Sequence, residues 1–254
     1  MIRMHISQEG GSEAVQPNSL FVTTRWSMVL NAKNKAAPGS KEALESLCRT
    51  YWYPIYAFVR GTGRFPPEAQ DLTQDFFVRL LTKDFLRVVT PDKGRFRTFL
   101  RMALKRFLAN EWDRTRALKR GGGATHLSFD TALAEERLGR ELGGGLAPDR
   151  MYDRSWALTL LDEAMTRLEH EYITEGKTNL WRQLQPHLTA ERGSIAYPEI
   201  AAALGLSEGA ARVAVHRFRK RFREVFRQTI ADTVSAPEEV DGELRLVLEI
   251  LSDG

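Results

Sequence analysis

Apolar side chains recur at three- and four-residue steps along most of this chain, which is the period of an α-helix. In residues 40–61, Leu47, Tyr51 and Phe58 keep this spacing on both sides of Pro54, so we expect the proline to kink the helix without ending it. Only residues 86–90 have weak strand character. The sequence therefore predicts an all-α fold.

Prolines and glycines divide this pattern into separate helices. Residues 121–150 contain two triple glycines, which are typical of a flexible segment, so we expect a linker there. Besides a short helix beginning at Thr23 or Thr24, the pattern predicts helices over 40–61, 66–81, 96–118, 149–172 and 177–188. The predicted organisation is a flexible N-terminus (1–22), a helical domain (23–120), the linker (121–150), a second helical domain (151–232) and an acidic C-terminal extension (233–254).

Composition and motifs exclude several classes of protein. The single cysteine, Cys48, cannot form an internal disulfide, and the first residues lack the apolar core of a signal peptide. The longest apolar runs are far shorter than the roughly 20 residues that span a bilayer. The five histidines lack metal-ligand spacing, and the chain has no P-loop, Rossmann or nucleophile-elbow motif. We therefore expect a soluble, cytoplasmic protein with no catalytic residue, metal or cofactor, and with no membrane insertion.

Charge is distributed unevenly, although the net charge is only +4. Residues 92–121 carry ten lysines and arginines against three acids, and residues 207–227 carry seven against two. Residues 228–254 carry one basic residue against seven acids. Two basic segments on helical patterns predict two contacts with a polyanion. The alternative is that both are solvated helix faces.

Residues 197–222 predict two helices joined by a tight turn. Pro198 suits the first turn of a helix, Gly205 suits the left-handed conformation that ends one, and Ser207 suits the N-cap of the next. A basic second helix after such a turn is typical of a helix-turn-helix (winged-helix-like) DNA-binding domain; the alternative is a helical hairpin that binds protein. The candidates to contact DNA are Ser207, Glu208 and Arg212 at base edges, Arg217, Arg219, Lys220, Arg221 and Arg223 at phosphates, and His216 beside them.

Three stretches of the chain together resemble a known family. They are AQDLTQDFFVRLL (69–81), KGRFRTFLRMALKRFLANEWDRTRALKR (93–120) and YPEIAAALGLSEGAARVAVHRFRKRF (197–222). Their order and spacing resemble the extracytoplasmic-function sigma factors of bacterial RNA polymerase, within the sigma-70 family. The resemblance is to a group with a long inter-domain segment and a C-terminal extension, and it covers about 24–120 and 150–230.

The resemblance implies a protein that directs the RNA polymerase core to promoters and melts DNA to initiate transcription. It further implies that the protein binds the polymerase as a monomer, and an anti-sigma protein is a further partner that the resemblance allows. By position, it assigns core polymerase binding to Asp71, Gln74, Asp75, Phe76 and Arg79. It assigns promoter melting and upstream-element binding to Arg95, Arg97, Arg101, Lys105, Arg106 and Trp112, with packing against a neighbouring helix as the alternative for Trp112.

Two alternatives stay open at this point. The main rival is a stand-alone helix-turn-helix regulator with an N-terminal dimerisation or sensing domain, and a third is a protein-interaction adaptor. The acidic tail raises a separate question. Val240, Leu244, Val247, Leu248 and Leu251 have helical spacing, so a tail helix either folds back to compete with DNA or completes the core of the second domain.

Overall fold

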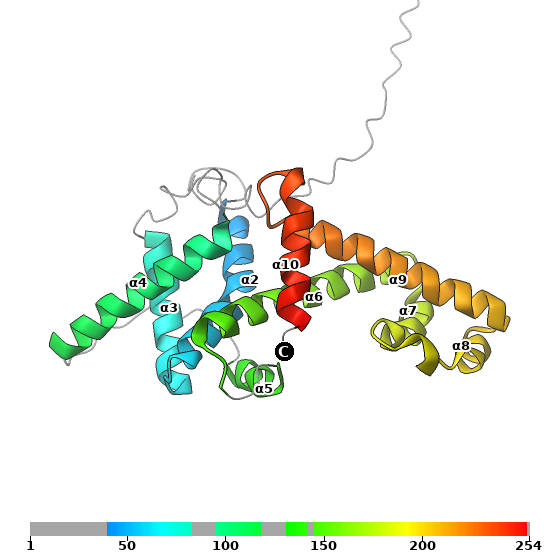
Figure 1. The fold of residues 1–254 in the computed structure, drawn as a ribbon, viewed down its shortest axis with the longest axis horizontal. Coiled ribbons are helices and arrows are strands. Elements are labelled where there is room, and N and C mark those ends of the chain that lie inside the picture. The colour runs from blue at the N-terminus through cyan, green and yellow to red at the C-terminus, as the bar shows by residue number, and fades with distance from the viewer. Residues whose placement is uncertain (1–39, 83–94, 118–130, 142–144, 253–254) are drawn as a thin grey trace, which may run out of the picture.

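The computed structural model describes residues 40–82, 95–117, 131–141 and 145–252. Every regular element in these ranges is an α-helix or a 3-10 turn, so the all-α prediction is confirmed for the part of the chain that the structure describes (Figure 1). No helix in these ranges is long and apolar enough to cross a membrane. The flexible segment predicted over 1–22 and the helix predicted near Thr23 lie outside the described residues.

The first half of the chain forms three helices, α2 (Ser40–Gly61), α3 (Pro66–Thr82) and α4 (Phe96–Ala117). As predicted, α2 continues through Pro54. Its last residue, Gly61, meets the start of a later helix so closely that an added Cβ would lie 2.6 Å from the Met151 sulfur. Only glycine allows this approach, which places the end of α2 directly against the second half of the chain.

The second half contains α6 (Pro148–Thr174), α7 (Thr178–Leu184), α8 (Tyr197–Leu204), α9 (Glu208–Ala231) and α10 (Val240–Ser252). Short 3-10 turns, η3 (Gln185–His187), η4 (Arg192–Ser194) and η5 (Pro237–Glu239), stand between them. Gly205 ends α8 with a φ of 64°, and the Ser207 hydroxyl accepts a hydrogen bond from the Ala210 N–H at 3.2 Å. Both roles were predicted from the residue types.

The segment predicted as a linker contains a docked helix, α5 (Thr131–Glu141). The Glu135 carboxylate of α5 accepts hydrogen bonds of 2.6 Å from the Tyr56 hydroxyl and from the Arg60 guanidinium of α2. The hydrogen bond from Arg60 lowers the pKa of Glu135. The prediction of a flexible segment is therefore wrong for residues 131–141, because Glu135 binds α2 and Ala134 and Leu138 pack against buried residues of other helices.

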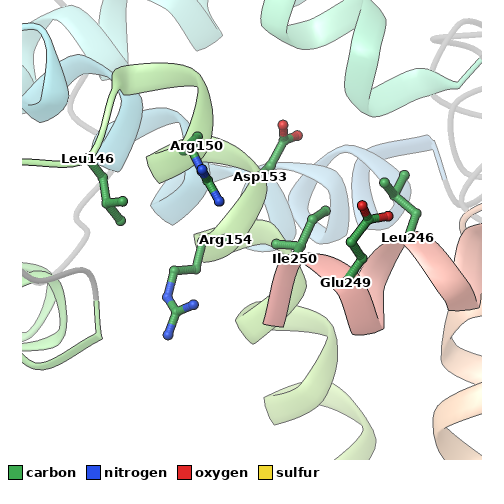
Figure 2. A pocket seen from close by; sticks show the side chains of 7 residues that line it. All are labelled: Leu146, Arg150, Asp153, Arg154, Leu246, Glu249 and Ile250. Carbon is green, nitrogen blue, oxygen red and sulfur yellow. The ribbon is translucent and has the colours of Figure 1, made fainter. Parts of the chain in front are cut away.

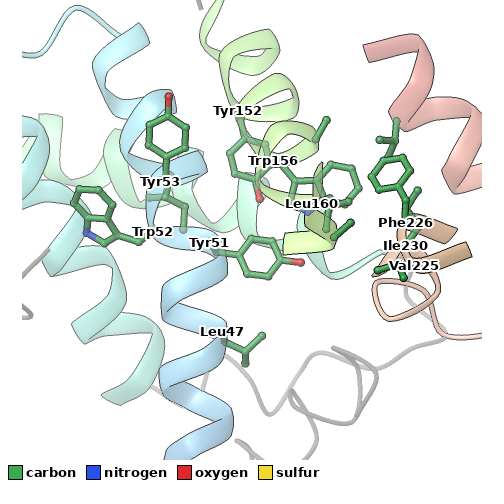
Figure 3. Packing of buried hydrophobic residues seen from close by; sticks show 14 of the residues in the cluster. Leu47, Tyr51, Trp52, Tyr53, Tyr152, Trp156, Leu160, Val225, Phe226 and Ile230 are labelled. Carbon is green, nitrogen blue, oxygen red and sulfur yellow. The ribbon is translucent and has the colours of Figure 1, made fainter. Parts of the chain in front are cut away.

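The core of the molecule is organised around α6. Tyr152, Trp156, Leu160, Ala164 and Leu168 form its fully buried stripe. In the first half of α6, Tyr152 lies edge-on to Phe58 of α2, and in the second half Tyr172 lies edge-on to Phe218 of α9. The buried residues of α2, α6 and α9 thus belong to one continuous cluster, which Figure 3 shows around Leu160. The two halves of the chain share a core.

We expect Leu160→Ala to lower the free energy of unfolding by about 2–5 kcal/mol, because the side chain is 0% exposed and its removal leaves a cavity. Because α6 contacts both halves, we expect one cooperative transition at a lower urea concentration, followed by circular dichroism and tryptophan fluorescence. Leu248→Ala removes the same atoms from a side chain that is 52% exposed, and we expect a change within about 0.5 kcal/mol. Equal midpoints for the two variants would contradict this account of the core.

Candidate nucleic-acid interface

Helix α9 has one buried side and one open side. Ala211, Val215 and Phe218 face the core. On the opposite side lie four exposed basic residues that form no ion pair with any described residue, and we call them the open stripe of α9. Its members are His216, Arg217, Lys220 and Arg223. Their spacing places them on one helix face, and Val213 lies exposed on the same face toward the start of the helix.

The turn before α9 gathers the three residues predicted to contact base edges. Ser207 caps α9, and Glu208 and Arg212 follow on its first turns. The Arg212 guanidinium donates a 2.6 Å hydrogen bond to Glu208 and lies 4.2 Å from the centre of the Tyr197 ring on α8. All three predicted residues are exposed, and the tyrosine and glutamate fix the orientation of the arginine.

Two of the predicted phosphate contacts instead hold the fold together. The Arg219 guanidinium donates to the His187 carbonyl from two nitrogens, at 3.0 and 2.6 Å, which satisfies the end of η3. Arg221 donates to both carboxylate oxygens of Glu171 on α6, at 2.9 and 2.8 Å. These arginines tie α9 to α6 and η3, so they are not part of the open stripe.

The basic face of α4 is covered by acidic side chains from other helices. Arg97, Arg101 and Lys105 follow one another at four-residue steps along α4 and face Asp149 and Asp153 of α6. The shortest distances are 3.0 Å from Arg97 to Asp153, 2.6 Å from Arg101 to Asp153 and 2.7 Å from Lys105 to Asp149. These residues were predicted to contact melted DNA, and the structure pairs them within the protein.

The first turn of α4 meets the C-terminal helix. Arg95 lies 2.7 Å from the Glu243 carboxylate of α10, and the Arg97 Nε donates to the same carboxylate at 3.0 Å. Arg97 is buried, with its guanidinium 4.6 Å from the centre of the Trp156 ring. Arg106, in contrast, is exposed and forms no ion pair with another described residue.

Two exposed aromatic residues lie near the far end of α4. Trp112 is 54% exposed, so it does not take the packed position that was its alternative. The Arg64 guanidinium lies 5.0 Å from the centre of its ring, and Phe65, directly beside Arg64, is 77% exposed. Arg64 and Phe65 were missed in the sequence, where the only signal was an aromatic residue in a turn just before Pro66.

Helix α3 divides the five residues assigned to polymerase binding. Asp71 and Asp75 are exposed one turn apart, whereas Gln74 and Phe76 are buried. Arg79 turns toward α4, where it lies 2.6 Å from Glu111. The exposed part of this predicted site is therefore a pair of carboxylates on the outer face of α3.

The open stripe and the basic helix α4 are far apart in the molecule. In Figure 1, α8 and the start of α9 lie at one end of the long axis, the far end of α4 lies at the other, and α10 lies between them. Among the described residues, no group of histidine, cysteine, aspartate and glutamate side chains has the arrangement of a metal site. Comparisons with protein-family models, curated protein sequences and solved structures found no match to this chain.

Cys48 lies in the α2 core and is a poor nucleophile. It is buried, and burial, together with the nearby Glu45, raises the pKa of its thiol to about 11. Because the thiolate is the reactive form, we expect iodoacetamide at pH 8 to alkylate the folded protein far more slowly than the protein in urea. Mass spectrometry of timed samples measures both rates. Equal rates would contradict the buried position of this side chain.

Proposed function

We propose that this protein is a sigma factor, which directs bacterial RNA polymerase core to promoters and initiates transcription by reading upstream elements and melting DNA. The observation that carries the proposal is the α8–α9 unit. A left-handed glycine turn, a serine-capped second helix and the open stripe of α9 are together the features of a helix-turn-helix that reads duplex DNA. The order of the three family-like stretches in the sequence supports the same function.

In this function the start of α9 enters the major groove of the upstream element. Glu208, Arg212 and Val213 are then close to base edges, where carboxylate, guanidinium and methyl groups each recognise different bases. Arg217, Lys220 and Arg223 follow along the same helix and contact phosphates, which fix the position of the helix but carry no sequence information.

The other end of the molecule supplies the remaining two activities. The exposed carboxylates of Asp71 and Asp75 form the polymerase-binding face of α3. Arg106, Trp112 and Phe65 offer a cation and two exposed rings, on which unstacked bases of a melted strand can stack. Arg95, just before α4, joins this surface only when its partner Glu243 leaves.

We expect the triple variant Arg217→Ala/Lys220→Ala/Arg223→Ala to bind duplex promoter DNA more weakly than the wild type. With each lost phosphate contact, fewer counterions are released on binding. The negative slope of log K against log salt should therefore become shallower by about 2 to 3. Fluorescence anisotropy at several salt concentrations measures both quantities. Arg140→Ala/Arg182→Ala/Arg245→Ala removes the same charge from exposed positions on other helices. If this control loses as much affinity and slope, the open stripe of α9 is not the DNA-binding surface.

We expect the wild type to capture core RNA polymerase in a pull-down, and Asp71→Arg/Asp75→Arg to lose this binding because it reverses the acidic face of α3. The control, Glu136→Arg/Glu238→Arg, reverses two exposed acids elsewhere and should keep it. Circular dichroism verifies that all three proteins are folded. A wild type that ignores polymerase but binds a palindromic duplex as a dimer would favour the stand-alone regulator instead.

A further inference from the structure

Glu243 differs from the other acidic residues of the C-terminal extension. Asp241 and Glu249 on the same helix are exposed, as are Glu238 and Glu239 just before it, whereas Glu243 is 1% exposed. Both of its carboxylate oxygens face α4, one accepting from Arg97 and the other lying beside Arg95. A carboxylate is costly to bury unless it is paired, so this contact fixes where α10 sits.

Carboxylates from α6 and α10 pair with successive cations at the start and along one side of α4. Along one face of α4, Arg95 and Arg97 meet Glu243, and the next cations of the helix meet the α6 acids described above. Guanidinium groups bind carboxylate and phosphate with the same planar geometry. The acids therefore occupy the positions that a nucleic-acid backbone would need.

Of the two helices that supply these acids, α10 contributes fewer residues to the core. Helix α6 carries the central stripe of the core, so its acids stay in place while the protein is folded. Helix α10 buries Val240 and Val247, but Leu248 is exposed. Beside this contact lies a pocket between the second half of α10 and the start of α6 (Figure 2), lined by Leu146, Arg150, Asp153, Arg154, Leu246, Glu249 and Ile250.

We propose that α10 is an internal competitor of single-stranded nucleic acid, in which Glu243 holds the phosphate-binding cations Arg95 and Arg97. The inference rests on the proposed function, because it takes α4 as the surface that meets the melted strand. With α10 in place, the start of α4 is closed to a polyanion. When α10 is displaced, Arg95 becomes available and Arg97 keeps only its contact with Asp153.

The test compares Glu243→Gln with Glu249→Gln. Both variants change the net charge by the same amount on the same helix, but Glu249 is exposed and pairs with no described residue. The probe is a labelled single-stranded oligo-deoxythymidine, titrated by anisotropy over a range of salt concentrations. We expect Glu243→Gln to bind about three- to tenfold tighter than the wild type and to steepen the salt slope by about 0.7 for each regained phosphate contact. Glu249→Gln should keep the wild-type slope.

A second measurement uses the unaltered protein, in case Glu243→Gln disturbs folding. Hydrogen exchange on the wild type should show residues 240–252 losing protection when the oligonucleotide is added, because the strand replaces the Glu243 contact. Equal affinities and slopes for the two glutamine variants, or a helix α10 that stays protected in the complex, would overturn the inference.

The outcomes also separate this inference from the proposed function. The oligonucleotide titrations are repeated in the Arg217→Ala/Lys220→Ala/Arg223→Ala background, so that the open stripe of α9 does not contribute. If duplex binding depends on that stripe but the two glutamine variants behave alike, the competitor role of α10 fails and the proposed function stands. If neither the wild type nor any variant binds DNA, both fail.

Discussion

The packing of α2 and α9 against a single helix, α6, determines the rest of the structure. Its buried stripe is continuous from Tyr152 to Leu168, so the same helix contacts both halves of the chain. This packing brings Asp149 and Asp153 beside α4 and thereby pairs the cations of that helix. It also places the start of α9 at one end of the molecule (Figure 1), and the open stripe along this helix is exposed. The apolar packing on α6 thus determines that the cations of α4 are paired within the protein, whereas the open stripe of α9 is exposed.

Within each basic segment, burial determines which cations have structural roles. A guanidinium near the core must find acceptors, and Arg97 and Arg219 find them in carboxylates and backbone carbonyls of other elements. Arg221 is exposed and pairs with Glu171 of α6 at the surface. Cations on the far side of α9 face no such requirement and stay available for a partner. A count of lysines and arginines in the sequence therefore overestimates the number of cations that are available to a partner. The position of each residue around the helix separates the two groups, because the open stripe lies opposite Ala211, Val215 and Phe218.

The sequence predicted the local structure well because helix ends depend on neighbouring residues. Gly205 and Ser207 mark the turn before α9 through their own backbone preferences, and Pro66 marks the start of α3. Contacts between distant segments have no such local signal. The pairing of Arg97 with Glu243 joins residues 146 positions apart. Helix α5 was missed for the same reason, since it is held by Glu135 binding to α2 and not by a strong apolar stripe of its own. The tail helix was predicted, and it packs into the core through Val247 and pairs with Arg97 of α4 through Glu243. Its competition with DNA stays a prediction.

For the proposed function, the shared core implies an order of contacts with DNA. Among the residues that the structure describes, α9 is the helix with a row of exposed cations that form no ion pair, so under the proposed function electrostatic attraction favours a first encounter through duplex DNA at the upstream element. The start of α4 has carboxylates where phosphates would bind, so an engaged single strand must replace an existing contact and not simply add one. Replacing Glu243 by a phosphate costs less free energy than leaving the buried Arg97 guanidinium without a partner. Arg97 keeps an acceptor throughout such an exchange, because it also pairs with Asp153. Under the proposed function, the surface that meets a melted strand would be closed to stray nucleic acid while the open stripe of α9 stays accessible to duplex DNA.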